Sequence, residues 1–228
     1  VEVNMETKMA YRSPKLNRDV IKYIAMLTML LNHISQIFMK SGYFLSELFL
    51  DIGYFTAITM CYFLVEGFQY THSKKNYAIR LLIFALISEI PYCMAFTTNG
   101  VLEFQGLNML FTLLICFIIL IVNDKVSNKF LKDIYILGLI VLSLFSDWAL
   151  LAPIFTLLFI WSRGSRNKIK YTFIISMLLF GLFNFAGGIG RFSIGTNIAY
   201  ALGSMLGIAL AGIVILYFYS GKRMEKGK

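Results

Sequence analysis

Long apolar runs separated by short polar stretches cover most of this 228-residue chain. An amphipathic stretch at 43–50 precedes the second of them. One helix crosses a bilayer in about 20 predominantly apolar residues. The pattern therefore predicts an all-α, polytopic transmembrane bundle of about eight membrane segments. The apolar runs are 20–39, 52–68, 77–96, 107–122, 134–161, 171–186 and 195–219.

The run at 134–161 counts as two of these segments because polar residues and a proline interrupt it. Ser146, Asp147 and Trp148 fall near its middle, and Pro153 follows them. The interruption leaves two arms of roughly 13 residues, which suit a re-entrant hairpin as well as two short spans. Asp147 at the tip could cap the second arm or approach a polar group of another segment.

Composition supports a membrane location for the whole chain. Hydrophobic residues make up 58% of it and charged residues only 14%, whereas a soluble domain averages about 25% charged residues. A soluble fold of this length could not hide so much apolar surface. We expect one transmembrane domain over 1–228, with a polar N-terminal segment at 1–17 and a basic tail at 220–228.

The positions of Lys and Arg predict the topology. All of them except Lys40 and Arg191 fall on one side if the segments alternate in direction. Because basic loops stay in the cytoplasm, we expect a multi-pass protein of the bacterial cell membrane with both termini cytoplasmic. The net charge of +9 then reflects this rule and contact with anionic lipid, so neither a nucleic-acid partner nor a metal site is predicted.

Ionisable groups inside apolar segments are expensive and are candidate functional groups. His33 lies in the first segment, and neutral imidazole can act as a general base near pH 7. A buried histidine with only a structural hydrogen bond is an equal alternative. Helical spacing places His33 on one polar face that we expect to turn toward the protein interior. The other members of this face are Lys22, Met26, Met29, Gln36 and Lys40.

Other polar residues in or beside the apolar segments are further candidates. A cationic rim that could hold phosphate groups is formed by His72, Lys74, Lys75 and Arg80, although positive-inside anchoring would also place them there. Glu89 lies half a turn out of phase with Arg80 on a straight helix, so we expect it to have another partner. Asn108 could join helices rather than catalyse.

Several short stretches, in this order and spacing, resemble the TraX family of membrane proteins, named for the F-pilin acetylase of conjugative plasmids. The resemblance begins at 24–34, which contains Asn32 and His33, and is good from about residue 18 to 115. It continues at 65–68, which contains Glu66, and at 70–71, 75–77, 80–82, 85–92 and 107–112. Weaker similarities are Ser146-Asp147-Trp148 and Tyr219-Ser220-Gly221.

This resemblance implies an acyltransferase that uses acetyl-CoA and a histidine in its first helix, which is His33 here. We expect an acetyl group to move to an amine of a membrane-associated substrate, such as a small membrane peptide or a pilin-like acceptor. His33 is the expected base, and Asp147 or Asn108 would orient it. The residues expected to bind coenzyme A are Lys22, Tyr70, Lys74, Lys75 and Arg80.

The resemblance leaves some motif positions without a defined role. Glu66 and Glu89 match polar positions of this kind, and Asn32 stands where the family usually has Asp. An amide can hydrogen-bond an imidazole but cannot charge it. A non-catalytic membrane subunit or a transporter of a conjugation- or secretion-type apparatus is therefore the alternative function.

Overall fold

The structure is a computed structural model that describes residues 16–97, 100 and 103–222. Most of the predicted N-terminal segment (1–15 of 1–17) and most of the basic tail (223–228 of 220–228) lie outside the described residues. Within them the chain is helical and has no strands, so the predicted all-α bundle is confirmed. The helices are α1 (Arg18–Phe38), α2 (Phe44–Gly53), α3 (Phe55–Tyr70), α4 (Lys74–Phe96), α5 (Met109–Lys125), α6 (Lys129–Leu142), α7 (Leu151–Trp161), α8 (Arg166–Gly188) and α9 (Ile194–Ile213).

Among the described residues, five helical stretches are long and apolar enough to cross a membrane. They are α1, α2 with α3, α4, α8, and α9 with the π-helical turn Val214–Phe218 that continues it. The apolar helix α7 has only 11 residues. The predicted second segment proves longer than 52–68, because only Tyr54 separates α2 from α3 and the pair forms one stretch, Phe44–Tyr70. The amphipathic stretch 43–50 is therefore the beginning of this segment.

The predicted break within 134–161 is present. Helix α6 ends at Leu142, a short 3₁₀ turn covers Ser143–Phe145, and α7 begins at Leu151. Pro153 is the third residue of α7, where a missing N–H removes no helical hydrogen bond. The polar residues before α7, rather than the proline, therefore mark the break in the helix.

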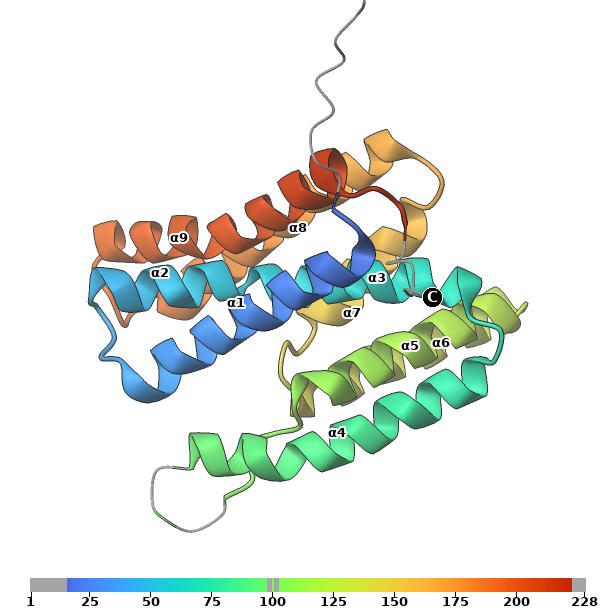
Figure 1. The fold of residues 1–228 in the computed structure, drawn as a ribbon, viewed down its shortest axis with the longest axis horizontal. Coiled ribbons are helices and arrows are strands. Elements are labelled where there is room, and N and C mark those ends of the chain that lie inside the picture. Colours follow the sequence, from blue (N-terminus) through green and yellow to red (C-terminus); the bar gives the residue numbers. More distant parts are fainter. Residues whose placement is uncertain (1–15, 98–99, 101–102, 223–228) are drawn as a thin grey trace, which may run out of the picture.

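Helix α3 lies at the centre of the bundle and packs against α1, α5, α7 and α9 (Figure 1). Its apolar side chains form much of the core, where Ile58 and Cys61 meet Phe117 of α5 and Phe155 of α7, all essentially inaccessible. Helices α4, α5 and α6 follow one another on one side of this centre, and α8 pairs with α9 on another. Helix α9 approaches α2 closely because Gly207 lies against the backbone of Asp51.

The basic residues gather at one end of the bundle, which we call the basic end. This end holds the start of α1, the α3–α4, α5–α6 and α7–α8 connections, and the last described residues (Figure 1). The two chain ends are joined there: Leu16 N donates to Phe218 O over 2.7 Å, and Arg18 N donates to Lys222 O over 2.9 Å. Lys40 and Arg191 lie in the connections at the opposite end.

Candidate active site

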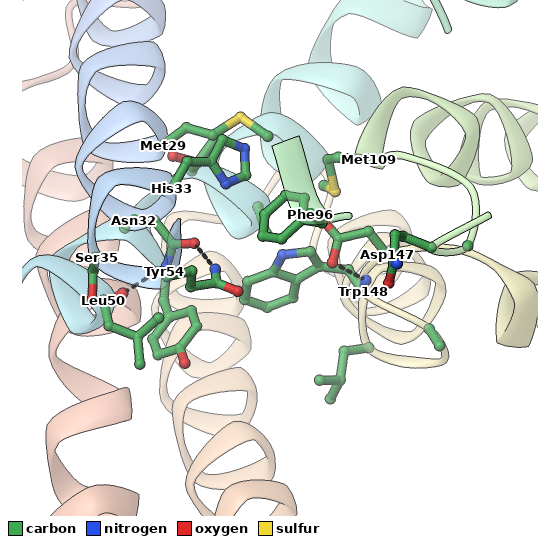
Figure 2. Close-up of a pocket in the computed structure, with 18 of the residues that line it drawn as sticks. Met29, Asn32, His33, Ser35, Leu50, Tyr54, Phe96, Met109, Asp147 and Trp148 are labelled. Carbon is green, nitrogen blue, oxygen red and sulfur yellow. Dashed lines mark hydrogen bonds between the residues drawn. The ribbon is translucent and has the colours of Figure 1, made fainter. Parts of the chain in front are cut away.

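The largest cavity opens toward the end opposite the basic end and has a volume of about 900 Å³. We call it the His33 cavity. Helix α1 contributes Met29 and His33, α4 contributes Phe96, and the turn before α7 contributes Asp147 and Trp148. Figure 2 shows these side chains around a common space, with His33 and Asp147 on different walls. The structure thus brings together two of the three predicted catalytic residues.

His33 has an incompletely satisfied imidazole ring in this cavity. Its Nδ1 atom is buried and has no hydrogen-bond partner among the described residues. The ring packs against the edge of Phe96, with 5.5 Å between ring centroids. Buried polar groups normally have a partner, so this nitrogen is an unsatisfied polar atom in a residue that lines the cavity. The alternative was a histidine held by a hydrogen bond within the protein, and Nδ1 makes no such bond among the described residues.

The polar face predicted for α1 is displaced from the face that the structure buries. The buried face carries Ala25, Thr28, Asn32 and Ser35. It is tied to α3 where Thr28 meets Thr56 over 3.0 Å, and to α2 where the Ser35 hydroxyl donates to Ser46 O over 2.8 Å. His33 lies at the edge of this face. The prediction of an interior location was wrong for Met26, which is half exposed, and for Lys40, which is exposed. Gln36 is also exposed but lines the His33 cavity.

Asn32 joins α1 to α2. Its Nδ2 donates to the Leu50 carbonyl over 2.9 Å, and its Oδ1 accepts a hydrogen bond from Gln36. The contact is close, since a Cβ added to Gly53 would lie 2.2 Å from the Asn32 Cβ. A carboxylate at position 32 could not donate to a carbonyl. The asparagine therefore matches its surroundings in this chain, and it bonds to Leu50 and Gln36 rather than to His33.

Asp147 is held by an unusual turn. Backbone bonds from Leu107 N to Phe145 O (2.9 Å) and from Asp147 N to Leu107 O (2.7 Å) attach this turn to the start of α5. Trp148 and Leu150 have positive φ angles of 58° and 62°, which are uncommon for large side chains and are often found at functional sites. Asp147 Oδ1 accepts from Trp148 N over 3.0 Å.

No hydrogen bond among the described residues joins Asp147 to His33, so the prediction that Asp147 orients the imidazole is not supported by the geometry. Instead, the carboxylate lines another wall of the same cavity. Its position suits contact with a ligand between the two walls. The sequence signal for this turn was the polar interruption of an apolar run.

Asn108, which is buried, and Glu89, which is partly buried, form a separate pair. Asn108 Nδ2 donates to Glu89 Oε2 over 2.8 Å and to Ala85 O over 2.9 Å, and its Oδ1 caps α5 by accepting from Leu110 N. Asn108 does not line the His33 cavity, so it joins α4 to α5 rather than orienting His33. The expectation that Glu89 has a partner other than Arg80 is confirmed.

A second pocket, of about 650 Å³, lies at the basic end between α1, α3 and α4. We call it the basic pocket. Of the predicted coenzyme-binding residues, Lys22, Tyr70 and Arg80 line it, together with His72. Arg18 also lines it, is 8% exposed, and has a buried Nε without a hydrogen-bond partner among the described residues. Arg18 was not predicted as a site residue, because its position among the basic residues at the start of the first segment suits cytoplasmic anchoring equally well.

Lys74 and Lys75 do not line the basic pocket. Lys74 Nζ is paired with Asp124 over 2.8 Å and lies 4.0 Å from the centroid of the Phe68 ring. Asp124 is two residues beyond the apolar run 107–122, and the hydrogen bond from Lys74 lowers the pKa of its carboxyl. Lys75 is exposed. Of the predicted rim, His72 and Arg80 line the basic pocket, where Arg18, Lys22 and Tyr70 also lie, whereas Lys74 and Lys75 do not line it.

Glu66 is close to these cations but belongs to a smaller pocket of about 300 Å³. The Tyr219 hydroxyl donates to both Glu66 oxygens, over 2.8 and 3.0 Å. The Tyr219 ring packs edge-on against Tyr62 and Phe63. The polar motif positions at 66 and 219, which are distant in sequence, are therefore direct partners. Within the described residues, no group of three or more His, Cys, Asp or Glu side chains could hold a metal ion.

The comparison with known families decides the identity of this arrangement. The sequence model described as TraX protein matches residues 17–226. The chain belongs to the TraX family. It is also 32% identical over 164 residues to the probable fimbrial assembly protein FimC, serogroup H1, of Dichelobacter nodosus, which covers 69% of this chain and 67% of that protein. No solved structure matches the chain.

For this TraX-family membrane protein, the structure gives the motif residues different surroundings. His33, Asp147 and Asn32 line the His33 cavity, and Arg80 lines the basic pocket. Glu66 bonds to Tyr219 in the smaller pocket. Asn108 bonds to Glu89 and joins α4 to α5, and Asn32 also joins α1 to α2.

Proposed function

We propose that this protein transfers an acetyl group from acetyl-CoA to an amine of a membrane-associated substrate. The observation that carries the proposal is the His33 cavity. His33, whose buried Nδ1 has no hydrogen-bond partner among the described residues, and Asp147 line different walls of this one space. A buried base beside an accommodating cavity is the usual arrangement for general-base catalysis.

The basic pocket would hold the phosphate groups of the donor. Both pockets are lined by α1, α3 and α4, the basic pocket near one end of these helices and the His33 cavity near the other. Lys22 and His33 are separated by about 16 Å along α1 at 1.5 Å per residue. The long pantetheine arm of coenzyme A suits such a separation between its phosphates and its thioester. Arginine side chains suit phosphate because they donate in pairs.

The reaction joins the acceptor nitrogen to the acetyl carbon. The neutral amine attacks the thioester carbonyl, a C–N bond forms, and the C–S bond breaks. His33 accepts the proton that the nitrogen loses and returns a proton to the departing thiolate, so the products are an amide and the coenzyme A thiol. Asp147 lies across the cavity, where its carboxylate would hold the incoming amino group by a charge-assisted hydrogen bond.

The expected orientation agrees with this assignment. Basic loops remain in the cytoplasm, so the basic pocket would face the compartment that contains acetyl-CoA. Both described chain ends lie at that end of the bundle. We therefore place the protein in the bacterial cytoplasmic membrane with its termini inside.

The name of the Dichelobacter nodosus relative favours a second function, a non-catalytic subunit of fimbrial assembly. The same name also suits an acetyltransferase whose acceptor is a small hydrophobic fimbrial peptide. The two functions differ in whether the protein binds acetyl-CoA. Ligand at 100 times its Kd should stabilise the enzyme by about 2.7 kcal/mol, whereas a passive subunit would show no stabilisation.

The decisive experiment measures acetyl transfer by the purified protein in lipid nanodiscs, with radiolabelled acetyl-CoA and short amphipathic peptides that carry a free N-terminus. His33→Ala should lower the rate by about 10²–10⁴-fold, as expected for loss of a general base. Leu137→Ala, which changes an exposed apolar residue of α6, is the control and should keep the wild-type rate. A His33→Ala protein as active as wild type would refute the mechanism.

A further inference from the structure

Arg18 is a cation in an unusual position. It is 8% exposed, lines the basic pocket, and has a buried Nε with no hydrogen-bond partner among the described residues. A buried guanidinium normally pairs with an anion, since an unpaired buried charge is costly. Glu66 is a candidate partner within the protein, since it interacts electrostatically with Arg18. The described residues nevertheless show no ion pair between Glu66 and Arg18.

Glu66 is instead bonded to Tyr219. The Tyr219 hydroxyl donates to both carboxylate oxygens, over 2.8 and 3.0 Å. The ring is fixed by Phe63, at 5.4 Å between centroids, and by Tyr62, at 6.2 Å. The backbone on either side of Tyr219 is fixed as well, because Leu16 N donates to Phe218 O and Ser220 N donates to Leu16 O. The carboxylate is therefore held toward the C-terminal segment, in the smaller pocket rather than in the basic pocket.

We propose that Tyr219 is a positioning residue that holds the Glu66 carboxylate away from Arg18, so that the Arg18 guanidinium can receive a phosphate group in the basic pocket. This inference rests on the proposed function only for the donor, coenzyme A, that supplies the phosphate. The shared chemistry is a phosphate monoester or diester, which a phospholipid headgroup could also provide. Without the tyrosine hydroxyl, Glu66 would pair with Arg18 and compete with the ligand.

The test measures the Kd of coenzyme A for the full chain in phosphatidylcholine nanodiscs. Arg18→Gln should raise the Kd by about tenfold or more, since hydrogen bonds to charged groups are worth about 1.5–3 kcal/mol. Tyr219→Phe retains the ring and should raise the Kd by roughly three- to tenfold. The double variant Tyr219→Phe with Glu66→Gln should bind with nearly the wild-type Kd, because the competing carboxylate is gone.

This rescue separates positioning from a purely structural role. A Tyr219→Phe protein that binds like wild type would overturn the proposal, as would a double variant that binds as weakly as Tyr219→Phe alone. Binding that is unaffected by Arg18→Gln would show that the basic pocket is not the phosphate site, and would also overturn it. Unchanged thermal stability of Tyr219→Phe without ligand is the expected control.

A second arm of the experiment distinguishes the two phosphate sources. Native mass spectrometry compares the phosphatidylglycerol retained by wild type, Arg18→Gln and the two Tyr219 variants. Lipid retention that follows the predicted order, with no coenzyme A binding, would support the positioning role and assign the pocket to a lipid headgroup. If neither ligand depends on Arg18, the proposal is wrong. If coenzyme A binding follows the order but no acetyl transfer occurs, only the proposed function fails.

Discussion

Glu89 and Asp147 are both acidic residues of motif stretches near the end of the bundle opposite the basic end, but their surroundings differ. Glu89 accepts three hydrogen bonds from the protein: from the Asn108 side chain, from Asn108 N (3.0 Å) and from Cys93 Sγ (3.7 Å). Within the described residues, the Asp147 carboxylate accepts one, from Trp148 N, and Asp147 lines a cavity. A carboxylate whose lone pairs are occupied within the protein fixes helices, whereas one left with free acceptor sites beside a cavity can bind a ligand.

In the comparison of these two carboxylates, the largest effect is expected on the rate of acetyl transfer when Asp147 is changed. Asp147→Asn keeps the size of the side chain and removes the charge that would hold the acceptor amine. Acetyl transfer should fall by about 10²-fold, a typical loss when one charged contact in an active site is removed. A radiolabel transfer assay in nanodiscs measures it, with the melting temperature as control. An Asp147→Asn protein that transfers acetyl normally would remove the functional distinction between the two carboxylates.

Glu89→Ala should affect stability instead. It leaves the Asn108 side-chain amide and backbone N–H without their acceptor, a loss of about 2–3 kcal/mol for buried donors to a charged group. Unfolding in mixed micelles of detergent and denaturant measures the change. Transfer per folded molecule should remain close to wild type. Loss of activity without loss of stability would contradict the structural role of Glu89.

Asn32→Asp replaces a buried amide with a carboxylate. The side chain could no longer donate to the Leu50 carbonyl and would face it with a second acceptor. We expect a loss of roughly 1–3 kcal/mol from this unfavourable pair, measured by the same unfolding assay. Asn32→Ser, which retains a donor on a shorter side chain, provides the comparison. A more stable Asn32→Asp protein would show that the carboxylate has another partner in this chain.

The smallest effect is expected at Asp124, an exposed carboxylate that pairs with Lys74. Asp124→Asn should change the free energy of unfolding by less than about 0.5 kcal/mol, since exposed ion pairs contribute little. Lys74→Ala should also leave coenzyme A binding unchanged, because Lys74 does not line the basic pocket. A weakened affinity after Lys74→Ala would return this lysine to the phosphate site.

The apolar segments could be predicted from the sequence, whereas only some of the residues that line the two larger pockets could be. The break at Asp147 and the general helical pattern agree with the structure because hydrophobicity depends on local composition. On α1, however, an assumed polar face pointed one residue away from the face that is buried. The buried contacts of that helix, such as Thr28 with Thr56 and Asn32 with Leu50, depend on which neighbour packs there.

Motif resemblance was informative about which residues matter but not about what they do. It selected Asn108 together with His33, although Asn108 bonds to Glu89. The resemblance included Lys75, which is exposed, but did not indicate Arg18, which is buried and lines the basic pocket. Charge and spacing do not show whether a lysine or arginine has a partner at hand, since that partner can come from any point in the chain.

The sequence by itself determined that this chain is a helical membrane protein, because long apolar segments can satisfy their backbone only as helices in lipid. It also determined the clustering of positive charge at alternate connections. Only the tertiary structure decided that His33 and Asp147 share one cavity, and that Glu66 bonds to Tyr219 rather than to Arg18. These outcomes depend on contacts between residues far apart in the chain, such as positions 66 and 219, which the packing of α3 against the C-terminal segment brings within hydrogen-bonding distance.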